Sequence, residues 1–324
     1  MKRKIISAAG WIISAAMIVS LFLKLDVGAL WKELISARWT WIAAAAALNL
    51  TVVFMKALRW QWFMRPQNAA RIQDILNATV IGMAGNNLLP ARGGDWLKIY
   101  LIGKWQSTCK TGLISVAGLD KLFDGLSLLI LFGILSMHST FPQWVKDGTI
   151  VFSIAMILLL SLSIFLLLHH RHEQNEMPKS WRRIRNFAAK LGNGLSALKS
   201  LRLTTGALAL SILASAAQIL TIWLCQKAYG LSLDMWVPAI VFVAVNLAIM
   251  IPSAPSGVGP FEMAAMLTYS WLGIKSEVGF SVALMYHAVQ FIPITLAGVV
   301  LYLETTRRSA HKGMEKAKTM VEVE

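Results

Sequence analysis

Three ionisable residues lie inside one apolar stretch of the chain. Asp120, Lys121 and Asp124 come about ten residues into the segment 111–136, near the middle of a helix that rises about 1.5 Å per residue. Asp120 and Asp124 are four positions apart and share a helix face, and Lys121 beside them can compensate their charge. An unpaired charge costs at least about 2.5–3.5 kcal/mol at this depth of a bilayer. The trio is therefore a candidate functional site, with an ion pair that locks helices together as the alternative.

Two other apolar stretches are interrupted by helix-breaking residues. Both interruptions run from an asparagine through proline and paired glycines to a carboxylate. Proline and glycine free backbone groups that lipid cannot satisfy, and the helix N-termini at the breaks favour an anion such as phosphate. Glycine also lets a headgroup approach the backbone closely. Kinked helices or ordinary loops are the alternative. The candidate residues are Asn87, Pro90, Arg92, Gly94 and Asp95 in the first segment and Pro255, Gly257, Gly259 and Glu262 in the second.

A histidine in the last apolar stretch gives the second interruption a counterpart to Lys121. Asp95 precedes Lys121 by 26 positions, and Glu262 precedes His287 by 25. This correspondence makes His287 a candidate site residue, although a lone histidine is more often a satisfied core residue. No residue pattern predicts a metal site or a cofactor, and Cys109 and Cys225 lie too far apart to form a ligand motif.

The composition indicates which kind of molecule holds these residues. The 324 residues are 56% hydrophobic and 15% charged, whereas soluble domains average roughly 25% charged. Apolar runs long enough to span a bilayer recur along the whole chain. The net charge of +15 sits in short loops between these runs, which indicates anionic lipid headgroups and not nucleic acid as the counter-charge. We therefore expect an all-α polytopic membrane protein.

Basic loops orient the chain. Lys and Arg gather at the N-terminus, in 58–75, in 169–203 and in the tail 305–324, so the positive-inside rule places both termini and these loops in the cytoplasm and the protein in the cytoplasmic membrane. Three apolar segments lie between the inside loops 58–75 and 169–203. A chain that crosses the membrane an odd number of times cannot end on the side where it started. We therefore expect two re-entrant broken-helix elements, at 75–91 and 236–272, or eight apolar passes if these count as spans. The six full spans are 5–23, 41–55, 111–136, 150–168, 206–227 and 279–303.

The spans form two halves of one plan. A single transmembrane domain, 1–304, divides into halves of about 1–140 and 141–304, each with three spans and one re-entrant element. One half starts inside and the other outside, which predicts an inverted repeat with a site where the broken helices meet. Residues 181–202 form a basic amphipathic pattern, expected to lie on the inner leaflet or to be a solvated linker helix.

The motifs together resemble the transmembrane region of lysylphosphatidylglycerol synthases, a flippase-like family. The resemblance rests on N-x-L-P-x-x-x-G-D at Asn87–Asp95, on Asp120-Lys121 with Asp124, and on G-x-G-x-x-E ending at Glu262. It extends from the second span to about Leu303. The family usually has Glu-Arg at Asp120-Lys121 and often Arg near His287, and lysine lacks the bidentate guanidinium of arginine.

The resemblance implies a lipid-translocating module. No segment outside the apolar runs is long enough for the soluble lysyl transferase domain of the full-length synthases. We expect a transporter of an anionic phospholipid or polyprenyl-phosphate lipid and not an enzyme, with the headgroup between the two broken segments and Lys121 and Arg92 supplying positive charge. The alternatives are an intramembrane lipid-modifying enzyme with Asp95 or Glu262 as base, and a regulatory partner of an envelope-lipid biosynthetic enzyme.

Overall fold

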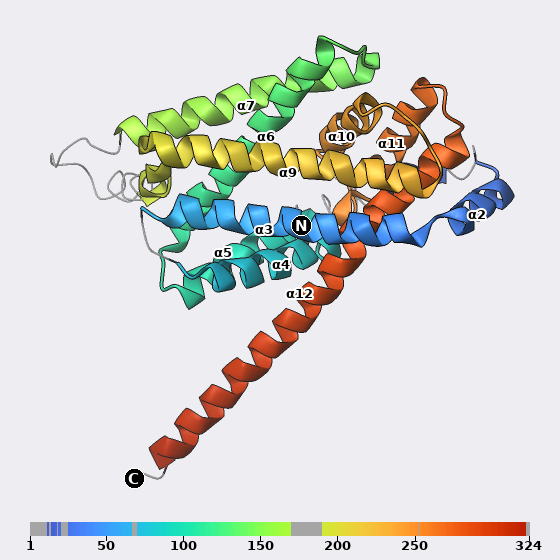
Figure 1. Cartoon of the computed structure of the whole chain (residues 1–324). Coiled ribbons are helices and arrows are strands. Elements are labelled where there is room, and N and C mark those ends of the chain that lie inside the picture. Colours follow the sequence, from blue (N-terminus) through green and yellow to red (C-terminus); the bar gives the residue numbers. More distant parts are fainter. Residues whose placement is uncertain are drawn as a thin grey trace.

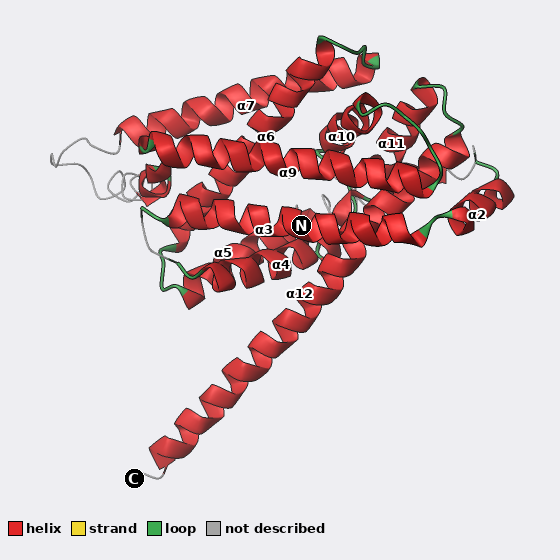
Figure 2. Ribbon diagram, in the orientation of Figure 1, coloured by secondary structure: helices red, strands yellow, loops and turns green. Residues whose placement is uncertain are grey.

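The protein is helical throughout the part of the chain that its computed structural model describes, namely residues 12, 14–17, 19–20, 25–66, 70–169, 190–251 and 253–321 (Figure 2). These residues contain no strand, so the predicted all-α class is confirmed. Most of the predicted first span, 5–23, and residues 181–189 of the amphipathic segment 181–202 lie outside the described residues.

Five long helices make up the body of the molecule: α3 (Trp39–Met64), α6 (Lys110–Ser136), α7 (Gln143–His169), α9 (Leu201–Ala228) and α12 (Ser276–Val321). Four of them, α3, α7, α9 and α12, contain stretches long and apolar enough to cross a membrane. The fifth, α6, has the length but carries the charged trio. The protein is thus an integral multi-pass membrane protein, while the total of six spans stays a prediction.

Shorter helices connect and interrupt the long ones. They are α2 (Val27–Ser36), α4 (Ile72–Leu88), α5 (Gly93–Trp105), α10 (Trp236–Ala248) and α11 (Pro260–Trp271), with 3-10 turns η1 (Pro90–Arg92), η2 (Ser196–Lys199) and η3 (Pro255–Gly257).

The first interruption forms an antiparallel helical hairpin, α4–η1–α5. Gly94 of α5 lies against Gly85 of α4, and at the base of the hairpin Gln106 Nε2 donates to Asp74 Oδ2 at 2.5 Å. Glycine permits this close approach because any side chain on Gly94 would collide with the backbone of α4. The second interruption, α10–η3–α11, also folds back on itself. Hairpins are the shape that re-entrant elements require, and their depth in a membrane stays a prediction.

The two hairpins approach one another from opposite sides of the body (Figure 1), and their turns η1 and η3 are in contact. The helices that precede them also correspond and run antiparallel, because the backbone N–H of Arg38 at the start of α3 donates to the carbonyl of Ala228 at the end of α9 (2.9 Å). Equivalent elements in opposite directions are what an inverted repeat requires.

The helix α12 passes beside both hairpins and contains Pro293. Proline has no N–H, so the carbonyl four residues earlier loses its helical partner. That carbonyl belongs to Val289 and accepts a hydrogen bond from Asn49 Nδ2 of α3 at 3.3 Å. An apolar residue at position 49 would leave the carbonyl without this partner.

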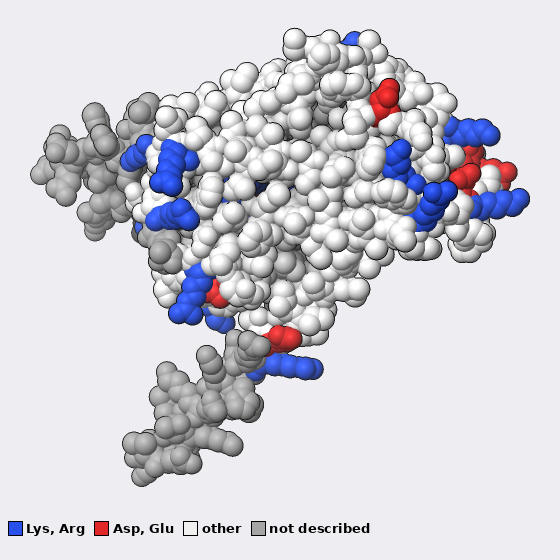
Figure 3. Space-filling view, viewed as in Figure 1, with Lys and Arg blue, Asp and Glu red and all other residues white. Residues whose placement is uncertain are grey.

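Charged side chains gather at the two ends of the body (Figure 3). Lys and Arg predominate where α3 and α7 end and α9 begins, whereas Asp, Glu, Lys and Arg mix at the opposite end (Figure 3). This asymmetry agrees with the loops that the positive-inside rule assigned to the cytoplasm. The orientation itself stays a prediction.

Gly94→Ala tests the packing of the first hairpin. A Cβ at this position would meet Gly82 O, Asn86 N and Gly85 C, all backbone atoms. We expect a loss of about 1–3 kcal/mol or more, since a rigid backbone must move. The measurement is thermal unfolding of the detergent-purified protein, followed by tryptophan fluorescence.

Gly118→Ala in α6 is the matched control, because nothing lies within 4 Å of its added Cβ. Alanine is the better helix former, so this variant should be slightly stabilised, by about 0.5–1 kcal/mol. Equal unfolding midpoints for the two variants would contradict the tight hairpin.

Candidate functional site

A buried arginine joins three long helices. Arg59 of α3 donates from Nε to Asp120 Oδ1 (3.1 Å) and pairs through Nη1 with Asp124 Oδ1 (2.8 Å), both on α6. The same Nη1 donates to Ser211 Oγ of α9 (2.5 Å). Only 1% of the Arg59 side chain is exposed. The guanidinium thus satisfies two carboxylates and a hydroxyl at once.

The sequence analysis placed Arg59 in an inside loop, and this prediction is wrong. The helix α3 continues past the predicted end of the second span at residue 55 to Met64. It can do so because the carboxylates of α6 neutralise the charge that would otherwise be left in the apolar interior. Lys56, one turn before Arg59, adds a second cation by pairing with Asp124 Oδ2 at 2.9 Å.

Lys121 has a different partner from the one predicted. It was expected to compensate Asp120 and Asp124, but Arg59 and Lys56 do so, and Lys121 Nζ lies 3.4 Å from Asp95 Oδ2 of α5. The reason is helical geometry, because adjacent residues point in different directions. The side chains of Lys121 and Asp95 are 45% and 32% exposed, so this pair is the accessible part of the first half.

The side chain of Asn86, from α4, makes hydrogen bonds to the first turn of α5. Its Nδ2 donates to Asp95 Oδ1 (2.8 Å), and its Oδ1 accepts from the backbone N–H of Asp95 (3.1 Å). Gly94 faces the backbone of α4. The expectation that this helix end and Gly94 lie open to an anion therefore needs correction, since the hairpin itself fills both.

Lys98 of α5 is a second cation that the structure buries. Its residue is 7% exposed, its aliphatic part lies against Gly82, and its ammonium sits 3.8 Å from the ring centroid of Trp60. Burying an ammonium costs several kcal/mol, and a desolvated cation–π contact offsets about 2 kcal/mol. Trp60 alone therefore does not balance this charge.

The second half holds a carboxylate–imidazole pair at the corresponding place. Glu262, like Asp95, is the third residue of the second helix of its hairpin. Its Oε2 accepts from Gly259 N at 2.8 Å, and its Oε1 contacts His287 Nδ1 of α12. Phe261 stacks on the imidazole with a centroid separation of 4.3 Å. Both Glu262 and His287 are buried, so the predicted correspondence with Asp95 and Lys121 holds in space.

Hydrogen bonds connect this pair to the other hairpin. His287 Nε2 lies 2.9 Å from Ser256 Oγ, which in turn donates to Asn87 Oδ1 of α4 (3.3 Å). Asn87 Nδ2 donates to Thr295 Oγ1 of α12 (2.8 Å). The polar side chains at both breaks thus form one continuous chain across η3, α4 and α12.

The backbone at each break takes an unusual conformation. Arg92 and Ser256 have φ of 53° and 63°, values that side-chain-bearing residues seldom adopt. Arg92 Nη2 also lies 3.5 Å from the carbonyl of Ile249 at the end of α10. Gly257 and Gly259 have φ of 78° and 98°, which explains why glycine occurs at these two positions.

The remaining predicted residues act through the backbone. Pro90 and Pro255 each start a 3-10 turn, where the missing N–H costs nothing. Gly259 lies against Ser14, whose hydroxyl accepts from the backbone N–H of Ala254 (2.8 Å). These positions shape the breaks.

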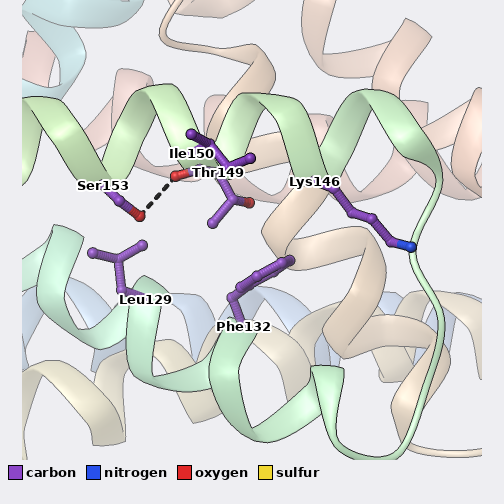
Figure 4. A pocket seen from close by; sticks show the side chains of 6 residues that line it. All are labelled: Leu129, Phe132, Lys146, Thr149, Ile150 and Ser153. Carbon is purple, nitrogen blue, oxygen red and sulfur yellow. Dashed lines mark hydrogen bonds between the residues drawn. The ribbon is translucent and has the colours of Figure 1, made fainter.

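A cavity of about 410 Å³ lies elsewhere, between α6 and α7 (Figure 4). Leu129 and Phe132 of α6 face Thr149 and Ile150 of α7 across it, with Lys146 at its rim (Figure 4). None of the predicted site residues lines this cavity, so it is separate from the paired breaks.

These features define the class: a polytopic helical membrane protein in which two broken hairpins meet and a buried arginine pairs with two carboxylates. Residues 7–298 match the family described as the lysylphosphatidylglycerol synthase TM region. The chain belongs to this family, as its motifs predicted.

Curated relatives include archaeal membrane proteins. The chain is similar to a UPF0104 membrane protein of Methanothermobacter thermautotrophicus, 22% identical over 316 residues that cover 89% of this chain and 92% of the relative. It is also similar to a UPF0104 membrane protein of Methanocaldococcus jannaschii, 26% identical over 222 residues that cover 67% of this chain and 92% of the relative. These names specify a membrane location and no substrate.

Arg59→Leu tests whether the buried guanidinium organises the site. It leaves Asp120 buried without its cation, so we expect destabilisation of about 3–5 kcal/mol. The Lys56→Leu control should cost about 1 kcal/mol or less, because Asp124 is 34% exposed and keeps Arg59. Thermal midpoints in detergent compare the two variants.

The double variant Arg59→Leu with Asp120→Leu separates charge from packing. Removing both charges should recover much of the stability lost in Arg59→Leu, since no unpaired charge then remains between them. A double variant less stable than Arg59→Leu alone would contradict an electrostatic role.

Proposed function

We propose that the protein is a flippase-like transporter that moves an anionic lipid, a phospholipid or a polyprenyl phosphate, across the cytoplasmic membrane. The observation that carries the proposal is the meeting of the two broken hairpins, η1 against η3, within the helical body. In transporters, broken helices that meet at a repeat interface form the substrate site.

Charges around this meeting point suit an anionic headgroup. Lys121 is half exposed and Arg92 is exposed at the tip of the first hairpin, so both can contact a phosphate. Asp95 and Glu262 orient Lys121 and His287 in the two halves. The same carboxylates are the candidates to carry protons that drive the cycle.

The contacts between the hairpins suit a moving interface. Among the described residues, the side-chain hydrogen bonds between the hairpins are Ser256 to Asn87 at 3.3 Å and Arg92 to the Ile249 carbonyl at 3.5 Å, and both are long. Long polar bonds are easier to exchange than interdigitated apolar packing. Rocking one half against the other would break them and open the site to the opposite side.

Reconstituted liposomes test this proposal. Purified protein should move headgroup-labelled phosphatidylglycerol or a labelled polyprenyl phosphate between leaflets, and Asp95→Asn and Glu262→Gln should each reduce the rate at least about tenfold, the effect of losing about 1.4 kcal/mol of interaction. Asp147→Asn, at an exposed carboxylate of α7, is the control and should transport normally.

Two results would count against this proposal, the first against transport itself and the second against a site at the paired breaks. One is movement no faster than in protein-free liposomes for every lipid tested. The other is a full rate in both Asp95→Asn and Glu262→Gln, which would place any transport path away from the paired breaks.

A second candidate function is an intramembrane enzyme that cleaves or transfers a lipid acyl group. It is favoured by the order Ser256 Oγ, His287 and Glu262, in which a hydroxyl contacts Nε2 of an imidazole whose Nδ1 contacts a carboxylate. This is the arrangement of an activated nucleophile, its base and the group that orients the base. Ser256 also has a positive φ, a strained conformation that recurs at functional sites.

In that function the Ser256 hydroxyl would turn its proton from Asn87 Oδ1 to His287 Nε2, and Oγ would attack an ester carbonyl carbon while His287 takes that proton. The proton would pass to the departing alcohol, and water would then release the acyl group from the serine. A fluorophosphonate probe tests the nucleophile directly, because it phosphonylates activated serines. Mass spectrometry should find the adduct on Ser256 in wild type and not in His287→Asn, with Ser253→Ala as the control. An unlabelled Ser256 in folded wild-type protein would eliminate the enzyme.

A further inference from the structure

Lys98 is a buried cation that lacks a counter-ion. Among the residues that the structure describes, no carboxylate lies within ion-pairing distance of its ammonium, and its contact is the face of Trp60. The residue is 7% exposed, so water does not solvate the charge freely. A buried charged group of this kind usually has a partner, and among the described residues no carboxylate pairs with Lys98.

The charges around Lys98 do not cancel one another. Asp120, Lys121, Asp95 and Arg59 are its charged neighbours. Together with Lys56 and Asp124, which complete the ion-pair network, they leave four cations facing three carboxylates. With Lys98 protonated, the cluster therefore carries one excess positive charge among apolar helices.

The accessible side of this cluster lies beside Lys98. Lys98 is three residues after Asp95 on α5, so the two side chains share one face of the helix. Lys121 reaches the same face from α6 through its contact with Asp95. That contact is long, at 3.4 Å, and the Lys121 side chain is 45% exposed, whereas Asp95 is also held by Asn86. Lys121 is thus able to turn toward a ligand without leaving Asp95 without a partner.

We propose that Lys98 and Lys121 form a binding subsite for one phosphodiester anion between α3, α5 and α6. A phosphodiester carries a single negative charge, which equals the excess charge of the cluster with Lys98 protonated, and its binding would stabilise that form. Lys98 is the inner contact, desolvated and fixed by Trp60, and Lys121 is the outer contact, through which the anion enters. The subsite deepens the proposed function and rests on it in taking a diester-linked lipid headgroup as the natural ligand.

Binding to the purified full-length protein in detergent tests the subsite. The probes are dihexanoyl phosphatidylglycerol, which has a lipid diester, dimethyl phosphate, which has the free diester, and dihexanoyl glycerol, which has no charge. We expect Lys98→Met to bind the phosphatidylglycerol about 10- to 100-fold more weakly than wild type, the usual range for losing a charge-assisted bond. Lys104→Met, at an exposed lysine of the same helix, should stay within about twofold of wild type.

A second measurement separates binding from folding. Without ligand, Lys98→Met should unfold at the same temperature as wild type or higher, because it removes an uncompensated buried charge. With phosphatidylglycerol, the wild-type midpoint should rise and the Lys98→Met midpoint should stay in place. If dimethyl phosphate also raises the wild-type midpoint, the protein recognises the diester alone. If only the lipid raises it, the glycerol and acyl parts are needed for binding as well.

Three results would overturn the subsite. Lys98→Met could bind phosphatidylglycerol as tightly as wild type, it could lose affinity for the uncharged dihexanoyl glycerol to the same degree, or it could unfold well below wild type in the absence of ligand. Transport is measured separately. Phosphodiester binding without lipid movement would overturn the transporter and keep the subsite. Normal transport by Lys98→Met would overturn the subsite and keep the transporter.

Discussion

Arg59 brings a permanent positive charge into the middle of a helical body with largely apolar surfaces, and the arrangement of three long helices follows from how that charge is neutralised. The guanidinium has fixed geometry and cannot lose its proton, so α6 must present Asp120 and Asp124 on the face that meets α3. Ser211 then fixes the position of α9 against the same group. The apolar residues around the cluster set the packing density, but they do not determine register, because many apolar side chains are interchangeable. The ion pairs specify one arrangement among the many that apolar packing would allow.

The same constraint governs the irregular backbone. Every interruption of a helix in a membrane protein frees polar backbone groups, and lipid satisfies none of them. In this protein, side chains take their place: Asn86 accepts from Asp95 N, Glu262 accepts from Gly259 N, and Asn49 donates to the carbonyl that Pro293 leaves without a partner. The asparagines and the glutamate near the breaks therefore stabilise the fold, whatever ligand the site binds. Replacing these residues would cause misfolding as well as loss of function, so stability has to be measured together with function.

The sequence predicted the parts of the site that depend on local chain chemistry. Proline and glycine located both breaks, and the similar spacings from Asp95 to Lys121 and from Glu262 to His287 identified two pairs that are in contact. It failed where partners come from distant helices. Arg59 was counted as a loop charge because a lysine or arginine near the end of an apolar run usually is one, and Lys98 was not identified as a site residue. Their burial depends on carboxylates and an aromatic ring from other helices, and the chain order gives no sign of these contacts. Ser256 was missed for the same reason, since only folding brings it to His287.

The two halves share a plan but differ in how open their charged pairs are. The side chains of Lys121 and Asp95 are 45% and 32% exposed, whereas those of His287 and Glu262 are 8% and 7% exposed. If the two pairs are equivalent positions of an inverted repeat, the structure captures one state of an asymmetric pair, with the first half accessible and the second closed. In an inverted repeat each half can take the conformation of the other. The alternative state is then the one in which Glu262 and His287 become accessible and Lys121 and Asp95 close. The hydrogen bond between Ser256 and His287 belongs to the closed form of the second half. Breaking it is therefore the change most directly connected with exchange between the two states.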